Sequence, residues 1–220
     1  MTGSGAEGGL GVDDRTYSES PGTLQGGAPL LAVVIGASAG GPGQVQMLLE
    51  QLPADFPVPI AVCQHMTAGA TAPWAERLNE CTPLRVVEAA PGDRFEAGTV
   101  YIAPTGKHMR LLGPARKPHI SLLPDFADAL HVPSIDFLMS SAADVFGSRV
   151  LGVILTGLGS DGALGMLAIR RAGGPTICER PETAPFASMP RAAAELGAAS
   201  QLIDLDDMAA AIMDRVVGRV

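Results

Sequence analysis

The sequence predicts an α/β fold: a doubly wound, mostly parallel sheet with helices on both faces, in a single domain. From Leu30 onward, short apolar runs end at Gly or Pro, as is typical of strands that are buried on both faces. Longer amphipathic stretches alternate with these runs, which is the pattern of βα units. A chain of 220 residues suits one domain, or a domain with a tail. The expected architecture is therefore three-layered and Rossmann-like.

Each element follows from a local pattern. HMRLLG and KPHISLL are expected to form a hairpin, since GPARKP between them is rich in turn residues. Pro190 suits the first turn of a helix, and Gly197 and the Gly173-Gly174 pair suit helix ends. The expected strands are residues 31–35, 58–64, 99–103, 150–155 and 175–179, and the expected helices are residues 43–51, 72–79, 134–146, 163–172, 190–196 and 206–217.

Composition excludes several classes of protein. Residues 1–29 are rich in Gly and polar residues and predict a flexible tail before a domain at 30–220. They lack a signal-peptide pattern, and no apolar run approaches the ~20 residues of a membrane span. A net charge of −8 without a Lys/Arg cluster argues against a nucleic-acid partner. Three scattered cysteines fit a reducing cytoplasm and neither a disulfide framework nor a zinc site. We expect no cofactor and no metal.

Residues 36–40, GASAG, lie between the first expected strand and the first expected helix. They match the G-x-S-x-G pattern of a nucleophile elbow, in which Ser38 is exposed at the helix N-terminus. The glycines fit such a sharp turn, because glycine accepts unusual backbone angles and close backbone approach. A structural turn or a phosphate-binding turn uses the same small residues, so the motif alone leaves those alternatives open.

His65 and Asp161 follow two other expected strands. Taken singly, His65 could be a structural histidine, and Asp161 could cap the helix that it precedes. Taken together with Ser38, they reach the same carboxyl edge of one sheet, where open α/β sheets place their ligand sites. A serine hydroxyl needs an imidazole to accept its proton, and the imidazole needs a carboxylate to orient it. The three residues therefore predict a Ser/His/Asp triad.

The chain order Ser, His, Asp differs from the order Ser, Asp/Glu, His of the α/β-hydrolases. Several segments instead resemble the catalytic domain of the CheB family of protein-glutamate methylesterases, over about residues 32–217. They occur in the family's order, so the resemblance is more specific than any single motif. The segments are IGASAGG (35–41), QHM (64–66), VYIAP (100–104) followed by His108, PSIDFL (133–138), GVILTGLGSDGA (152–163) and MPRAAAELGA (189–198).

The resemblance implies hydrolysis of γ-glutamyl methyl esters on methyl-accepting chemotaxis receptors, with release of methanol, and in some members deamidation of receptor glutamines. It implies that Ser38 is the nucleophile, that His65 is the general base and then the general acid, and that Asp161 orients His65. The partners would be these receptors or a similar methylated signalling protein.

Further expectations concern the cleft and its control. Backbone N–H groups near Ala39, Gly40 and Leu158 are candidate oxyanion donors, and Met66 is a candidate cleft residue. Val132 stands where the family usually has Arg, and residues 181–190 are rich in proline, which predicts a different lip of the cleft. Family members commonly carry an N-terminal receiver domain. A tail of 29 residues is too short for one, so constitutive activity, a separate regulator and a role in another signalling system remain open.

Two other functions remain open. A nucleotide-binding module would use residues 36–43 as its phosphate turn, but they lack the full G-x-G-x-x-G pattern, and no acidic residue ends the second strand. A catalytically idle scaffold in a signalling complex would need residues 181–190 to close the cleft. The other three histidines, His108, His119 and His131, are expected to be surface or structural residues, since they show no ligand spacing.

Overall fold

The computed structural model describes residues 29–125 and 130–218. The tail expected over residues 1–29 lies outside the described residues except for Pro29. No helix within the described ranges is long and apolar enough to cross a membrane.

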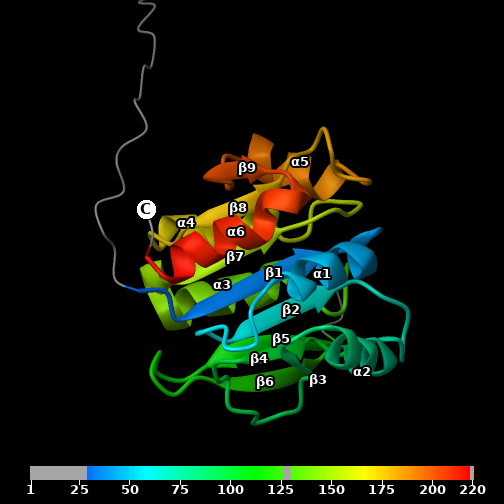
Figure 1. The fold of residues 1–220 in the computed structure, drawn as a ribbon, viewed down its shortest axis with the longest axis vertical. Helices are drawn as coiled ribbons and strands as arrows, with labels where there is room; N and C mark the ends of the chain where they lie inside the picture. Colours follow the sequence, from blue (N-terminus) through cyan, green and yellow to red (C-terminus); the bar gives the residue numbers. More distant parts are fainter. Residues whose placement is uncertain (1–28, 126–129, 219–220) are drawn as a thin grey trace, which may run out of the picture.

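A single sheet of seven parallel strands forms the centre of the domain (Figure 1). Its strand order is β3-β4-β2-β1-β7-β8-β9, and a separate antiparallel hairpin joins β5 to β6. The strands are β1 (Ala32–Ala37), β2 (Ile60–Gln64), β3 (Arg85–Glu88), β4 (Thr99–Ile102), β5 (Lys107–Leu112), β6 (His119–Pro124), β7 (Val150–Ile154), β8 (Thr176–Glu179) and β9 (Gln201–Ile203).

Helices cover both faces of the sheet. Alternate residues of β1 point into two separate cores: Val33 and Ile35 lie in one, and Ala32 and Val34 lie in the other. The first core includes residues of α1 (Gly41–Glu50), α2 (Thr71–Cys81) and α6 (Leu205–Val216). The second includes residues of α3 (Ile135–Phe146), α4 (Ala163–Arg171), α5 (Ser188–Glu195) and the β5–β6 hairpin. This arrangement confirms the predicted doubly wound α/β fold.

The structure adds to the expected elements and shifts several boundaries by one or two residues. The expected hairpin and all six expected helices are present, but α5 begins at Ser188, two residues before Pro190. The expectations omitted β3 and β9. Both are short edge strands in which most residues are only partly buried or exposed, so their sequences lack the continuous apolar run of a central strand. Cys63, Cys81 and Cys178 are free thiols.

The strand order reverses at the carboxyl end of β1. The chain moves from β1 to β2 on one side and later returns to β7 on the other side of β1. In open α/β sheets, ligands bind at such a reversal of strand order. The loops that follow β1, β2 and β7 therefore meet at one edge of the molecule.

Gly36 in β1 permits a close contact between the sheet and α3. A Cβ atom at this position would lie 2.3 Å from Ile135 Cγ2 and 2.9 Å from Ile154 Cδ1. Gly36→Ala should therefore lower the free energy of unfolding by about 1–3 kcal/mol, because the core must move to accept the methyl group.

Gly43→Ala is the matched control for this substitution. Its added Cβ meets no atom within 4 Å, and alanine favours a helix interior over glycine by about 0.5–1 kcal/mol. Urea unfolding of both variants measures the difference. Equal midpoints for the two variants would show that the contact between Gly36 and Ile135 is not tight in solution.

Candidate active site

Ser38 lies at the sharp turn between β1 and α1. Gly40, which precedes the helix, has a φ of 77°, a conformation that favours glycine. The backbone N–H of Ser38 donates to the carbonyl of Thr156 at 3.0 Å, which ties the turn to the end of β7. Gly157 allows this close approach, because a Cβ there would lie 2.8 Å from Ser38 Cβ. Ser38 itself is partly exposed.

Gln64, at the end of β2, connects this turn to His65. Its side-chain Nε2 donates to the carbonyls of Ser38 at 2.7 Å and of His65 at 3.0 Å. A Cβ at Gly41 would lie 2.1 Å from Gln64 Oε1, so only glycine leaves room for the buried amide. The same amide thus fixes the two loops that carry Ser38 and His65.

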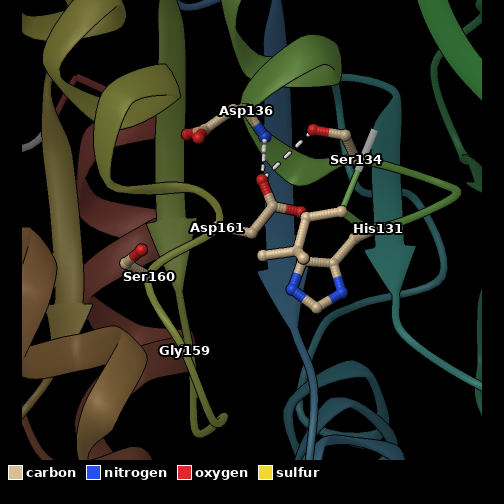
Figure 2. A pocket seen from close by; sticks show the side chains of 7 residues that line it. His131, Ser134, Asp136, Gly159, Ser160 and Asp161 are labelled. Atoms are coloured by element: carbon tan, nitrogen blue, oxygen red, sulfur yellow. Dashed lines mark hydrogen bonds between the residues drawn. The ribbon is translucent and has the colours of Figure 1, made fainter. Parts of the chain in front are cut away.

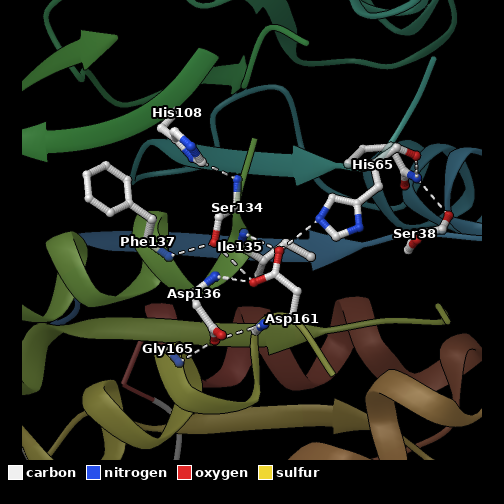
Figure 3. Close-up of polar contacts among 11 residues, drawn as sticks. Ser38, His65, His108, Ser134, Ile135, Asp136, Phe137, Asp161 and Gly165 are labelled. Atoms are coloured by element: carbon white, nitrogen blue, oxygen red, sulfur yellow. Dashed lines mark hydrogen bonds and ion pairs between the residues drawn. The ribbon is translucent and has the colours of Figure 1, made fainter. Parts of the chain in front are cut away.

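His65 and Asp161 are hydrogen-bonded partners. His65 Nε2 donates to Asp161 Oδ2 at 2.9 Å, and the side chains are only 12% and 8% exposed. The other ring nitrogen, Nδ1, is buried and has no hydrogen-bond partner among the described residues. Figure 3 shows the His65 ring between Asp161 and Ser38. The free nitrogen is therefore the one available to a group on the Ser38 side.

The carboxylate of Asp161 is held by the first turn of α3 (Figures 2 and 3). It accepts hydrogen bonds from the backbone N–H groups of Ile135 at 2.8 Å and Asp136 at 2.9 Å, and from Ser134 Oγ at 3.2 Å. Burial raises the pKa of Asp161, but the hydrogen bonds from His65 and from these two N–H groups outweigh it, so the pKa lies below the ordinary value. Asp161 is thus held as an anion against His65.

Asp136 performs the reciprocal task for α4. Its Oδ1 accepts from the N–H groups of Gly162 at 2.9 Å and Gly165 at 2.7 Å. Burial raises the pKa of Asp136, and nearby Asp161 acts in the same direction against those hydrogen bonds. The interpretation of Asp161 as a cap of its own helix is therefore wrong: Asp161 caps α3, and Asp136 caps α4.

A cavity of about 300 Å³ opens beside the pair. Figure 2 shows His131 and Asp161 at its wall. The ring of His131 stacks on that of His65, with centroids 4.3 Å apart and planes inclined by 17°. The sequence had given no reason to bring these two histidines together. The lining residues are Leu130, His131, Ser134, Asp136, Gly159, Ser160 and Asp161.

The candidate oxyanion donors lie in two neighbouring loops. The N–H groups of Ala39, Gly40 and Leu158 donate no hydrogen bond to any residue in the described ranges. Ala39 and Gly40 belong to the Ser38 turn, and Leu158 belongs to the loop after β7, whose Gly157 touches that turn. Met66 packs against the first core, so its side chain has a structural environment.

Thr156 is a site residue that the sequence analysis missed. Its Oγ1 donates to the carbonyl of Ala39 at 3.1 Å and accepts from the N–H of Phe186 at 2.9 Å. Its backbone N–H donates to Gln44 Oε1 at 3.3 Å, and Gln44 donates to the buried carboxyl of Glu179 at 2.6 Å. Burial raises the pKa of Glu179, against the hydrogen bond from Gln44. A motif search does not find such a set, because its members are polar residues that become neighbours only in the folded chain.

His108 also has a structural place near the site. It is 1% exposed, and its Nδ1 accepts from the N–H of Ser134 at 3.3 Å. Burial lowers the pKa of His108, although Asp125 and Asp161 act in the opposite direction. It therefore supports Ser134, the N-cap of α3, which agrees with the expected structural role.

The two acidic caps should give stability opposite dependences on pH. The lowered pKa of Asp161 contributes stability above the unfolded pKa of about 3.9, and this is lost as the pH falls through the folded pKa. Asp161→Asn should therefore lose less stability than the wild type between about pH 5 and pH 3.

Asp136 has a raised pKa, so the folded protein takes up its proton first, and this uptake adds stability as the pH falls. Asp136→Asn lacks that gain and should lose stability more steeply than the wild type. Urea unfolding at a series of pH values, each normalised to the same protein at neutral pH, measures both slopes. Parallel curves for the two variants would contradict these assignments.

Comparisons with known proteins agree on one family. A model described as "CheB methylesterase" matches residues 33–212. A protein-glutamate methylesterase/protein-glutamine glutaminase 2 of Nitratidesulfovibrio vulgaris is 46% identical over 182 residues, covering 83% of this chain and 50% of that protein. The protein-glutamate methylesterase/protein-glutamine glutaminase 3 of Geobacter sulfurreducens is 43% identical over 201 residues, covering 91% of this chain and 53% of that protein.

The fold gives the same result. The crystal structure of the Thermotoga maritima CheB methylesterase catalytic domain superposes with a TM-score of 0.81 at 35% identity, covering 85% of this chain and 99% of that one. The chain spans about half the length of the curated relatives that it matches. The chain belongs to the CheB methylesterase family.

Proposed function

We propose that this chain is a serine hydrolase that removes methyl esters from glutamate side chains of methyl-accepting chemotaxis receptors. The observation that carries the proposal is the position of His65, hydrogen-bonded to Asp161 through Nε2 with its buried Nδ1 left on the Ser38 side. The names of its relatives support the substrate class, since they describe protein-glutamate methylesterases and protein-glutamine glutaminases.

The first half of the reaction forms an acyl-enzyme. Ser38 Oγ attacks the ester carbonyl while His65 Nδ1 takes its proton, and Asp161 stabilises the imidazolium through Nε2–H. The tetrahedral intermediate then collapses. Its C–OCH₃ bond breaks, and the proton on Nδ1 passes to the departing oxygen to give methanol. A glutamyl group remains bonded to Ser38 Oγ.

The second half regenerates the enzyme. Water enters, gives a proton to His65 Nδ1 and attacks the acyl carbon, and the Ser38 oxygen leaves with that proton. The product is a glutamate side chain. On a glutamine side chain the same steps release ammonia in place of methanol, which is the glutaminase reaction in the relatives' names.

The ring nitrogens exchange roles relative to the serine-protease template. In that template the carboxylate binds Nδ1 and the serine faces Nε2, whereas here Asp161 binds Nε2. The chemistry is equivalent, because each nitrogen can carry the proton while the other accepts one. The first turn of α3 supports this arrangement, since it fixes Asp161 on the Nε2 side.

The negative oxygen of the intermediate needs donors that are already in place. We assign this role to N–H groups of the Ser38 turn and of the loop after β7, at Ala39, Gly40 and Leu158. Their positions in two loops joined by the contact between Ser38 and Gly157 support the assignment.

The rim of the cleft decides whether a substrate can reach Ser38. Residues 181–190 are tied to the loop after β7, because Gly157 N–H donates to the carbonyl of Phe186 at 2.9 Å. Ser38 nevertheless keeps part of its surface exposed. This argues against an idle scaffold with a closed cleft. We propose action in the cytoplasm on receptors or a similar methylated signalling protein.

Ser38→Ala should abolish methanol release from a radiolabelled methylated receptor, because no hydroxyl remains to form the acyl-enzyme. Ser148→Ala changes an exposed serine in the short turn before β7 and serves as the control. It should release methanol at the wild-type rate. Equal release by wild type and Ser38→Ala would refute the serine mechanism.

Asp161→Asn should lower kcat by about 10⁴, the effect known for the equivalent change in a serine protease, because the amide favours the wrong imidazole tautomer. Steady-state kinetics on the methylated receptor measure it. In ¹⁵N spectra of histidine-labelled protein, His65 of the wild type should carry its proton on Nε2. An unchanged kcat would reduce Asp161 to a helix cap.

A further inference from the structure

His131 occupies a position that the triad alone does not explain. Its ring stacks on His65 at a centroid separation of 4.3 Å and an inclination of 17°. Its side chain also lines the cavity next to Asp161 (Figure 2). No hydrogen bond joins the His131 ring to Ser38 or Asp161 in the described part of the chain. The contact with His65 is therefore one of ring faces.

Such a contact supplies a restraint that His65 otherwise lacks. The single hydrogen bond from Nε2 to Asp161 fixes one atom of the ring, and Nδ1 has no partner among the described residues to fix a second. A ring held at one atom can still tilt about that bond. A flat neighbour packed against its face opposes the tilt, and parallel offset rings are a preferred arrangement of aromatic pairs.

The segment that carries His131 is itself well anchored. The carbonyl of Val132 accepts from the N–H of Gly106 at 3.4 Å, and Ser134 caps α3 by accepting from Phe137 N–H at 3.3 Å. The same short segment thus places His131 against His65, and it places the first turn of α3 against Asp161, the hydrogen-bond partner of His65. A Cβ at Gly159 would lie 3.9 Å from His131 Nε2, so the loop after β7 runs close to the ring.

We propose that His131 is a positioning residue: its ring holds the plane of His65 so that Nδ1 faces Ser38 while Nε2 faces Asp161. This inference rests on the proposed function of His65 as the base. It assigns no proton transfer to His131. The stacked face also covers the imidazolium that forms in each half of the reaction, and a cation over an aromatic face is electrostatically favourable.

Two substitutions separate the ring face from the chemistry of imidazole. His131→Leu fills a similar space without a flat ring, whereas His131→Phe keeps the ring and removes both nitrogens. With a short peptide that carries a γ-glutamyl methyl ester, His131→Leu should lower kcat about 10- to 100-fold with little change in KM, as expected for a misplaced catalytic group. His131→Phe should stay within about 3-fold of the wild type, since the restraint remains.

Two kinetic outcomes would overturn the proposal. If His131→Phe lost as much kcat as His131→Leu, the imidazole nitrogens would matter and the ring face would not. If His131→Leu kept the wild-type kcat, the stack would be dispensable. Thermal unfolding of both variants checks that they are folded, and a fall in kcat without a matching fall in Tm excludes a purely structural role.

A spectroscopic readout tests the stack without relying on activity. The chain has four histidines, so the ring protons of His65 can be assigned by comparison with His65→Gln. In the Ser38→Ala background, the ring current of His131 should shift those protons upfield. The shift should persist in His131→Phe and vanish in His131→Leu, and an unchanged shift in His131→Leu would overturn the proposal.

The combined results distinguish a failure of the proposed function from a failure of the positioning role of His131. Wild-type protein that shows the shift but hydrolyses no ester would overturn the proposed function, and the positioning role with it. Active wild-type protein whose kcat survives His131→Leu would overturn the positioning role alone.

Discussion

The carboxylate of Asp161 lies at the N-terminus of α3, where two backbone N–H groups and Ser134 bind it. A helix N-terminus has unsatisfied donors and a partial positive charge, so it stabilises an anion without a cationic side chain. Together with the hydrogen bond from His65, this interaction keeps Asp161 ionised, although burial raises its pKa. It also fixes Nε2 as the ring nitrogen of His65 that carries the proton. The proposed proton transfer from Ser38 depends on that choice.

Close packing of backbone against side chains makes the interaction possible. Gly36 lets Ile135, the first residue of α3, approach β1, and Gly162 leaves room for the same residue near the start of α4. The reciprocal caps then join the two helices: Asp161 serves α3, and Asp136 serves α4. A carboxylate at each helix start satisfies donors that would otherwise be buried without partners. The hydrogen bonds that hold Asp161 are thus part of the packing of α3 against α4.

Much of the fold follows from local pattern. The central strands β1, β2 and β7 are apolar, except for Gln64 at the end of β2, because both of their faces are buried. The helices between them have one apolar face. The edge strands β3 and β9 were not predicted, since their pairing depends on a neighbour and not on their own composition. In the site, the elbow motif singled out Ser38. His65 and Asp161 could be found only by their shared sheet edge and by the family resemblance.

The sequence by itself therefore determined the α/β class, the order of the main elements and the three residues that the chain brings to one sheet edge. These depend on residue types and on short-range periodicity, which a single chain displays directly. Only the tertiary structure decided which helix Asp161 caps, which nitrogen of His65 stays free, and that His131 stacks on that ring. Each of these is a contact between segments far apart along the chain, and its geometry depends on how closely the layers pack.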